Sequence, residues 1–134
     1  MISTSHTPFV VVVDDDPSVR RSLRRLVGSI GYEVESFSSG DAFLAEGIGG
    51  TADCLVFDIH MPGMDGFGLL KEIRASGIET AVVFISAHAD TQTRARAISN
   101  GAVALLAKPF RFDDLSEVLS RGIKETLAAR ENKE

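Results

Sequence analysis

Three aspartates could do chemistry in this chain, because they lie at the ends of two short apolar runs. Asp14 and Asp15 come after Phe9–Val13, and Asp58 comes after residues 54–57. If both runs are buried parallel strands, the three carboxylates meet at one rim of a sheet. Two carboxylates about 5 Å apart repel each other by roughly 3 kcal/mol at an effective dielectric of about 20. The group therefore needs a counter-charge, and Mg²⁺ suits it because this cation prefers oxygen ligands.

A lysine and a serine reach the same rim by the same argument. Lys108 follows the apolar run Ala104–Ala107 and precedes Pro109, and Ser86 follows residues 81–85. The ammonium group is a second positive charge for the carboxylates, and the hydroxyl can donate a hydrogen bond to a phosphoryl oxygen. Phosphoryl transfer depends mainly on positioning and on neutralising the charge of the equatorial oxygens. These side chains suit an aspartate that accepts a phosphoryl group beside a cation.

Apolar runs alternate with amphipathic segments along the chain, which predicts five strand–helix units. Such a chain is expected to fold as an α/β protein, with a parallel sheet covered by helices on both faces and right-handed crossovers. The strands are expected at Phe9–Val13, Glu33–Phe37, 54–57, 81–85 and Ala104–Ala107. The helices are expected at Pro17–Ile30, 39–46, 67–76, 91–100 and 112–127.

Length and composition indicate one acidic domain of 134 residues with a net charge of −5. We expect no nucleic-acid binding by this chain, because phosphate contacts need clustered Lys and Arg. The single cysteine, Cys54, excludes an internal disulfide and a cysteine-rich zinc site. With no signal peptide and no apolar stretch near the roughly 20 residues of a membrane span, a soluble cytoplasmic chain is expected. The domain is expected at 9–127, between a flexible N-terminal tail (1–8) and a C-terminal tail (128–134).

Four motifs in the chain resemble the receiver domain of bacterial two-component response regulators. They are V-V-V-D-D-D-P, F-D-I-H-M-P-G-M-D-G, F-I-S-A-H and L-A-K-P-F, and the resemblance covers residues 9–127. The sequence is most similar in style to receivers of FixJ/NarL-type transcription regulators. The resemblance implies the flavodoxin-like (βα)5 fold with strand order 2-1-3-4-5. It also implies a phosphorelay signalling protein that catalyses only its own phosphoryl transfer and dephosphorylation, and so is not an enzyme.

The resemblance implies a role for each polar residue at the rim. Asp58 would accept the phosphoryl group from a sensor histidine kinase. Ser86 would be the switch hydroxyl that turns toward the phosphoryl group, and Lys108 would pair with a phosphoryl oxygen. The peptide between Lys108 and Pro109 is expected to be cis, which the proline makes tolerable.

The resemblance also implies how Mg²⁺ would be held. Asp15 would ligate the cation directly and Asp14 through water. Asp58 would supply a further carboxylate oxygen, and His60 its backbone carbonyl. Asp16 fits better as the N-cap of the following helix, since Asp is a preferred capping residue.

Two surfaces are candidates for partners. Arg20, Arg21, Arg24 and Arg25 line the outer side of the first helix, which is either a solvated face or, as in the family, the docking face for the kinase. The fourth helix, fifth strand and fifth helix would form a new interaction surface after phosphorylation, including a possible homodimer. That output would serve transcription regulation.

Two features leave the switching behaviour open. Leu105 stands three residues before the lysine, where the family normally has an aromatic residue whose ring turns inward on phosphorylation. How the hydroxyl and this position switch together is therefore open. His60 and His88 lie two residues beyond Asp58 and Ser86, at positions that tune dephosphorylation in the family. The alternative is that both are surface histidines.

Two other functions remain as alternatives. A pseudo-receiver would keep the fold and signal without phosphate. The presence of Asp14, Asp15 and Asp58 argues against this alternative, whereas Leu105 argues for it. A phosphatase with an aspartyl-phosphate intermediate would also use Asp, Lys and Mg²⁺ on a parallel sheet. Such enzymes resemble D-x-D at the nucleophile strand, whereas this chain has Asp58-Ile59-His60.

Overall fold

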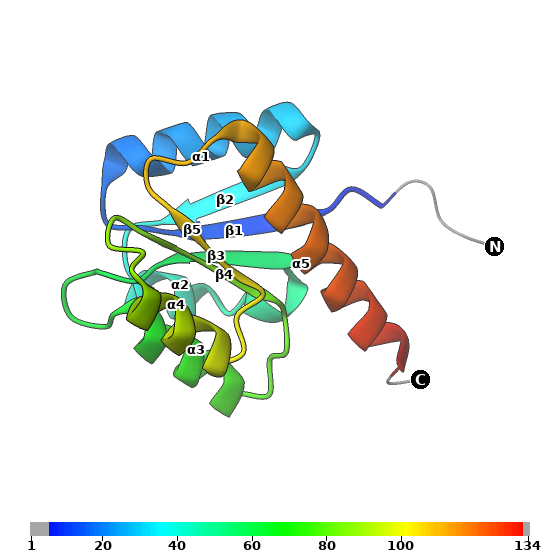
Figure 1. Cartoon of the computed structure of the whole chain (residues 1–134). Coiled ribbons are helices and arrows are strands. Elements are labelled where there is room, and N and C mark those ends of the chain that lie inside the picture. Colours follow the sequence, from blue (N-terminus) through cyan, green and yellow to red (C-terminus); the bar gives the residue numbers. More distant parts are fainter. Residues whose placement is uncertain (1–5, 133–134) are drawn as a thin grey trace.

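The computed structural model describes residues 6–132, so residues 1–5 and 133–134 of the expected tails lie outside the described residues. Its strands form one parallel sheet in the order β2-β1-β3-β4-β5 (Figure 1). This order confirms the expected flavodoxin-like α/β fold. The strands are β1 (Phe9–Val13), β2 (Glu33–Phe37), β3 (Cys54–Asp58), β4 (Val82–Ser86) and β5 (Ala104–Ala107).

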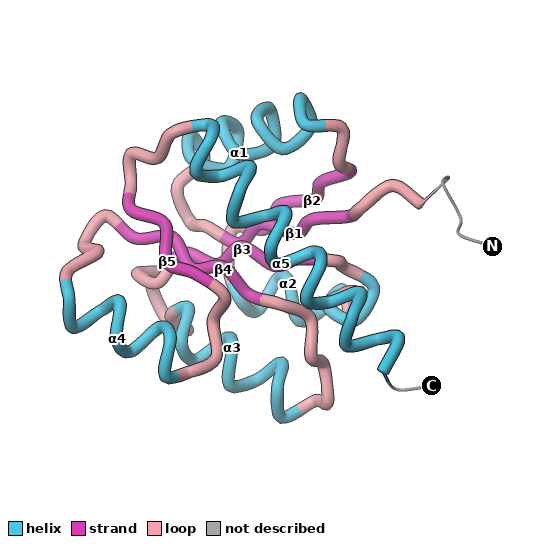
Figure 2. The backbone as a smooth tube through the Cα atoms, turned by 45° about the vertical axis from the view of Figure 1, so that its right-hand side comes forward, coloured by secondary structure: helices cyan, strands magenta, loops and turns pink. Residues whose placement is uncertain are grey.

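Helices cover both faces of the sheet. In Figures 1 and 2, α1 and α5 lie on one side of the strands, and α2, α3 and α4 lie on the other. A short 3₁₀ helix, η1 (Gly49–Thr51), precedes β3, between the helix and the strand that the sequence predicted. The α-helices are α1 (Pro17–Ile30), α2 (Gly40–Glu46), α3 (Gly66–Ala75), α4 (Thr91–Ser99) and α5 (Phe112–Asn132).

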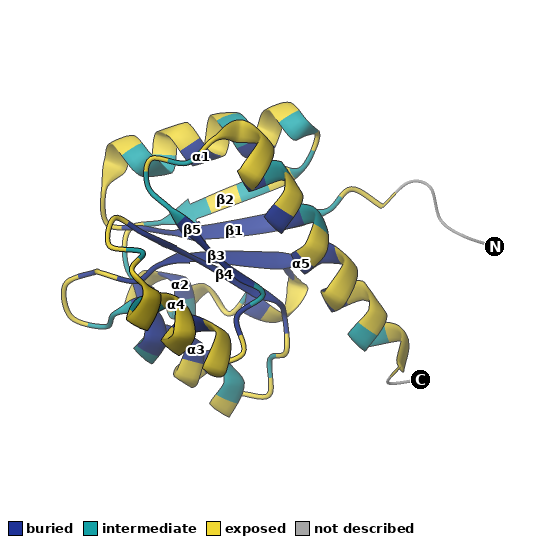
Figure 3. Ribbon diagram, in the orientation of Figure 1, coloured by how far each residue is buried: buried dark blue, intermediate teal, exposed yellow. Residues whose placement is uncertain are grey.

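The central strands are buried on both faces, as the continuous apolar runs predicted (Figure 3). Successive side chains of a strand point to opposite faces. In β1, Val11 and Val13 therefore pack into the core under α2, α3 and α4, whereas Val10 and Val12 pack under α1 and α5. This burial fixes the carboxyl end of β1, and hence the place of the aspartates that follow it.

Capping residues begin two helices next to the rim of the sheet. The side chain of Asp16 accepts hydrogen bonds from the Ser18 backbone and hydroxyl, so the expected N-cap of α1 is confirmed. Asp65 caps α3 by accepting from the Gly68 backbone at 2.8 Å. A Cβ atom on Gly66 would lie 2.5 Å from the Asp58 carbonyl oxygen. Glycine at this position therefore lets α3 start directly against the end of β3.

The last helix is longer than the sequence predicted. An end at residue 127 was expected because the following residues are polar, but α5 continues to Asn132. Arg130 accounts for the difference, because its guanidinium donates to Asp53 Oδ1 at 2.8 Å and to the Ala52 carbonyl at 2.5 Å. The predicted helix end was wrong, whereas the domain boundaries at 9 and 127 remain a prediction. None of the helices within residues 6–132 has both the length and the apolar character of a bilayer span.

Candidate functional site

The three aspartates predicted to meet at the rim do meet there. Asp14 and Asp15 follow β1, Asp58 is the last residue of β3, and each offers a carboxylate oxygen within 4.8 Å of the others. Asp14 is 0% exposed and Asp58 is 4% exposed, whereas Asp15 is exposed. Two of the three carboxylates are therefore removed from the solvent that would otherwise screen their repulsion.

One lysine serves both buried carboxylates. Lys108 follows β5, and its Nζ lies 3.0 Å from Asp14 Oδ2 and 3.3 Å from Asp58 Oδ1. The Lys108–Pro109 peptide is cis, as predicted. The lysine is thus placed at the acidic cluster, as the order of the strands required.

The pocket has too little positive charge for its carboxylates. Burial, together with the charge of Asp14, raises the pKa of Asp58 from 3.8 to about 6, although Lys108 opposes the rise. Burial alone would lower the pKa of Lys108, but the Asp14 and Asp58 carboxylates beside its ammonium group raise it. The lysine therefore keeps its proton, yet it does not fully compensate Asp58.

A buried oxygen in the pocket lacks a hydrogen bond. Asp14 Oδ2 forms an ion pair with Lys108 at 3.0 Å but accepts no hydrogen bond within the described part of the chain. Buried polar atoms in proteins are nearly always satisfied. An unsatisfied carboxylate oxygen beside two further carboxylates fits a hard cation with oxygen ligands. The cluster of Asp14, Asp15 and Asp58 could therefore hold a metal ion.

The structure places Ser86 at the rim, with its hydroxyl turned to the following loop. Ser86 is the last residue of β4 and is fully buried, and its Oγ accepts a hydrogen bond from the His88 backbone at 2.9 Å. The two histidines come together, with ring centroids 5.6 Å apart and planes at 83°. Both line the acidic pocket, and the His60 backbone N–H donates to Asp58 Oδ1, with 3.4 Å between nitrogen and oxygen.

Sequence reasoning missed the hydrogen bonds that two arginines donate to backbone carbonyls around the rim. Arg20 had been assigned to the outer row of α1, but its Nη1 donates to the Asp14 carbonyl at 2.7 Å. Arg94 of α4 donates to the Leu105 carbonyl at 3.0 Å. The only available signal was position: α1 starts directly after the pocket, so a long side chain in its first turns can reach back to it.

The chain belongs to the response regulator receiver domain family, whose profile matches residues 10–120. Receivers of this family are signalling domains rather than enzymes, and a histidine kinase is their partner. The fold and the acidic pocket described above agree with this membership.

Relatives with known names are 35–39% identical to this chain. Response regulator protein TodT of Pseudomonas putida is 35% identical over 123 residues, which are 92% of this chain and 54% of that protein. Transcriptional regulatory protein FixJ of Bradyrhizobium diazoefficiens is 35% identical over 116 residues, which are 87% of this chain and 57% of that protein. DNA-binding transcriptional regulator NtrC of Salmonella typhimurium is 39% identical over 115 residues, 86% of this chain and 24% of that protein.

A solved structure is equally similar. The response regulator StyR superposes with a TM-score of 0.84 at 37% identity, covering 96% of this chain and 65% of that chain. This chain spans about half the length of TodT and FixJ. What those whole proteins do can therefore enter here only as a proposal.

Proposed function

We propose that Asp58 accepts a phosphoryl group from a histidine kinase and that this chain is the switch of a two-component phosphorelay. The observation that carries the proposal is the charge arrangement at the rim. Asp58 belongs to a cluster of three carboxylates, and it shares a single lysine with Asp14. A structural ion pair needs only two charges, whereas this arrangement leaves carboxylate charge for a ligand to neutralise.

The transfer step follows from these groups. A lone pair of an Asp58 carboxylate oxygen forms the new bond to phosphorus. The bond between phosphorus and the imidazole nitrogen of the kinase phosphohistidine breaks, and its electron pair stays on that nitrogen. Lys108 Nζ, 3.3 Å from Asp58 Oδ1, is placed to offset the charge that gathers on the equatorial oxygens. Asp58 must be ionised to attack, and with a pKa of about 6 it is mostly ionised at neutral pH.

Asp14, Asp15, Asp58 and the backbone carbonyl of His60 would hold Mg²⁺ in this pocket. The bound cation supplies positive charge that lowers the cost of bringing a phosphoryl group to three carboxylates. Ionised Asp58 is favoured by that charge as well, because an opposite charge nearby lowers the pKa of a carboxyl group.

The docking surface for the kinase would be α1 together with the loop after β5. A groove between them, lined by Val19, Leu26, Pro109 and Phe110, lies beside Lys108. The exposed arginines of α1, Arg21, Arg24 and Arg25, would steer an acidic partner. Because the kinase presents its phosphohistidine in the cytoplasm, we place this chain there too. With a net charge of −5, the chain itself would not bind nucleic acid.

Phosphorylated Asp58 would change the conformation of the loop after β4. Phosphorylation adds about −1.5 to −2 charges at the rim, and Ser86 would leave the His88 backbone to donate to a phosphoryl oxygen. Shifting the populations of two conformations from 1:99 to 99:1 requires about 5.5 kcal/mol of difference in interaction free energy. Hydrogen bonds to charged groups supply about 1.5–3 kcal/mol each. The expected result is a changed α4–β5–α5 surface, on which Ile98 and Phe112 are already exposed, for a homodimer or partner in transcription regulation.

The test is the intact mass after incubation with acetyl phosphate and Mg²⁺. We expect one added phosphoryl group on the wild-type chain and none on Asp58→Asn. A wild-type chain that binds Mg²⁺ but gains no mass with either acetyl phosphate or a kinase would indicate a pseudo-receiver. Sustained hydrolysis of phosphomonoesters would instead indicate a phosphatase.

A further inference from the structure

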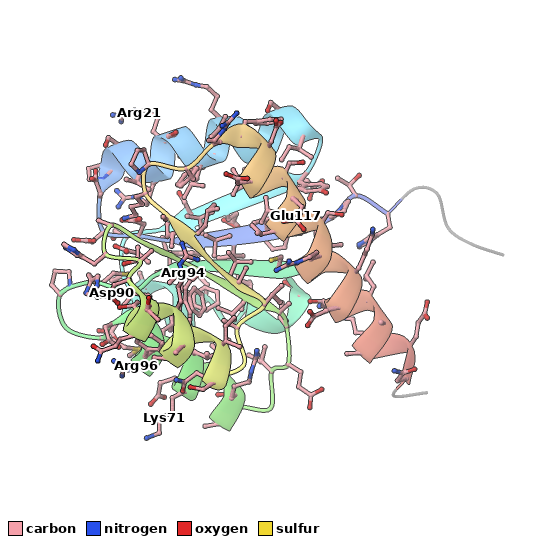
Figure 4. All side chains as sticks on the ribbon, in the orientation of Figure 1. Arg21, Lys71, Asp90, Arg94, Arg96 and Glu117 are labelled. Carbon is pink, nitrogen blue, oxygen red and sulfur yellow. The ribbon has the colours of Figure 1, made fainter. Side chains whose placement is uncertain are left out.

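Arg20 differs from the other arginines of α1. Its side chain is half-buried, and its Nη1 donates to the Asp14 carbonyl at 2.7 Å. The neighbouring Arg21 is exposed and points outward from the helix (Figure 4). Arg24 and Arg25 are exposed as well. Arg20 therefore contacts a residue of the acidic pocket, whereas the other three arginines of α1 face the solvent.

The bond from Arg20 fixes the peptide that joins the first two aspartates. The Asp14 carbonyl is part of the same planar unit as the Asp15 nitrogen, so holding this oxygen sets the direction in which Asp15 leaves the strand. The backbone N–H and one carboxylate oxygen of Asp14 have other hydrogen-bond partners. Its backbone N–H donates to the Phe37 carbonyl at 3.1 Å, and its Oδ1 accepts from the Asp16 backbone at 2.9 Å.

Asp15 depends on this backbone support more than the other two aspartates do. Its side chain is exposed and makes no hydrogen bond or ion pair within the described part of the chain, whereas Asp14 and Asp58 are buried and both contact Lys108. A side chain without partners of its own is placed by its backbone. Any change in the Asp14–Asp15 peptide plane would therefore move this carboxylate relative to the cluster.

We propose that Arg20 is a positioning residue for cation binding: it locks the Asp14–Asp15 peptide so that the Asp15 carboxylate faces the pocket. The proposal rests on the proposed function, because the cation is the same one. Charge alone predicts the opposite effect, since a guanidinium near three carboxylates competes with Mg²⁺. Removing Arg20 thus tightens Mg²⁺ binding if only its charge matters and weakens it if its hydrogen bond matters.

The experiment is an NMR titration of the full chain with MgCl₂, following backbone amide shifts, in Arg20→Met and in the matched control Arg21→Met. Both variants lose one positive charge from adjacent positions of α1, but only Arg20 contacts the pocket. We expect Arg20→Met to weaken Mg²⁺ binding about tenfold, as is typical when a residue that orients a metal ligand is removed. Arg21→Met should stay within about twofold of wild type, because an exposed charge is largely screened.

Two further measurements separate positioning from a general loss of structure. Labelling of Arg20→Met by acetyl phosphate should reach the wild-type extent at saturating Mg²⁺, and its backbone amide shifts without Mg²⁺ should match those of wild type outside the surroundings of Asp14 and Asp15. Arg20→Lys, which keeps the charge and one reaching donor, should recover part of the affinity. Equal or tighter Mg²⁺ binding by Arg20→Met than by Arg21→Met would overturn the proposal. Failure of the wild-type chain to bind Mg²⁺ would instead overturn the proposed function.

Discussion

Buried aspartates lie at both ends of the sheet, and their surroundings differ. Before β3, at the amino end, Asp53 accepts from the Phe9 backbone and from Arg130, both at 2.8 Å, and His6 Nε2 lies 3.2 Å away. At the carboxyl end, Asp14 and Asp58 share Lys108, and one Asp14 oxygen accepts no hydrogen bond from the described residues. Asp53 is satisfied by the fold, whereas the carboxylates of the pocket are left in need of a cation.

This contrast separates a structural carboxylate from those of the proposed site, which have the same residue type and similar burial. Asp53 is 1% exposed and joins the start of β1 to the end of α5, and Arg130 also donates to the Gly50 and Ala52 carbonyls. Its charge is compensated without a ligand. We therefore expect substitutions at the two ends of the sheet to change stability in opposite directions.

The largest effect is expected from Asp53→Ala. The change leaves the partly buried Phe9 N–H without its acceptor. It also removes the ion pair with Arg130, which solvent partly screens because the arginine is 40% exposed. We expect the free energy of unfolding to fall by about 2–3 kcal/mol, measured by urea denaturation. Glu46→Ala, an exposed carboxylate on α2, is the control and should change it by less than about 0.5 kcal/mol. A loss as small as the control's would show that Asp53 is not structural.

Asp58→Asn is expected to act in the other direction. In the Mg²⁺-free chain at pH 7.5 the ionised Asp58 is disfavoured by burial and by Asp14, so a neutral side chain of the same shape should stabilise the fold. We expect a gain of about 1–2 kcal/mol in the same urea assay. If Asp58→Asn destabilises the chain as Asp53→Ala does, then ionised Asp58 stabilises the fold like Asp53, and the contrast between the two ends of the sheet is wrong.

The gain from Asp58→Asn should depend on pH. Because the pKa of Asp58 is raised from 3.8 to about 6, the folded chain binds this proton more tightly than the unfolded chain. That contribution to stability is complete below the unfolded pKa and is lost as pH rises through about 6. The stability difference between variant and wild type should therefore be small near pH 4 and grow to its full size above pH 6.5. A difference that stays constant from pH 4 to 7 would contradict the raised pKa.

The amino-end and carboxyl-end aspartates should also differ in their response to Mg²⁺. At ten times its dissociation constant, a ligand of the folded state stabilises it by about 1.4 kcal/mol. Asp15→Asn should weaken Mg²⁺ binding by about tenfold or more and so lose about 1 kcal/mol of this stabilisation. Calorimetric melting with and without MgCl₂ measures it. Asp53→Ala should keep the full Mg²⁺ response, and loss of that response in Asp53→Ala would break the distinction.

The carboxyl end was predictable from sequence because local signals converge there. Each apolar run ends in a polar residue, and parallel strands bring their carboxyl ends to one rim. The sequence therefore predicts that the three carboxylates and the lysine lie together, as they do. Pro109 likewise marked the cis peptide.

The amino end was not predictable by the same reasoning. Asp53 and Arg130 are 77 residues apart, and each lies in a polar segment that resembles a loop or a fraying helix end. Pairing between two such residues depends on how α5 lies across the sheet, which periodicity does not give. Arg20 was missed for a related reason: helical spacing gives the face of a residue, but a long side chain can bend back past that face.

The most direct test of the account is to locate the phosphoryl group. The chain is incubated with acetyl phosphate and MgCl₂, treated with borohydride, which reduces an aspartyl phosphate to homoserine, and sequenced by tandem mass spectrometry. The account predicts homoserine at position 58 and unchanged aspartate at positions 14, 15 and 53. Phosphorylated protein whose reduced product maps to any other residue, with Asp58 intact, would contradict it.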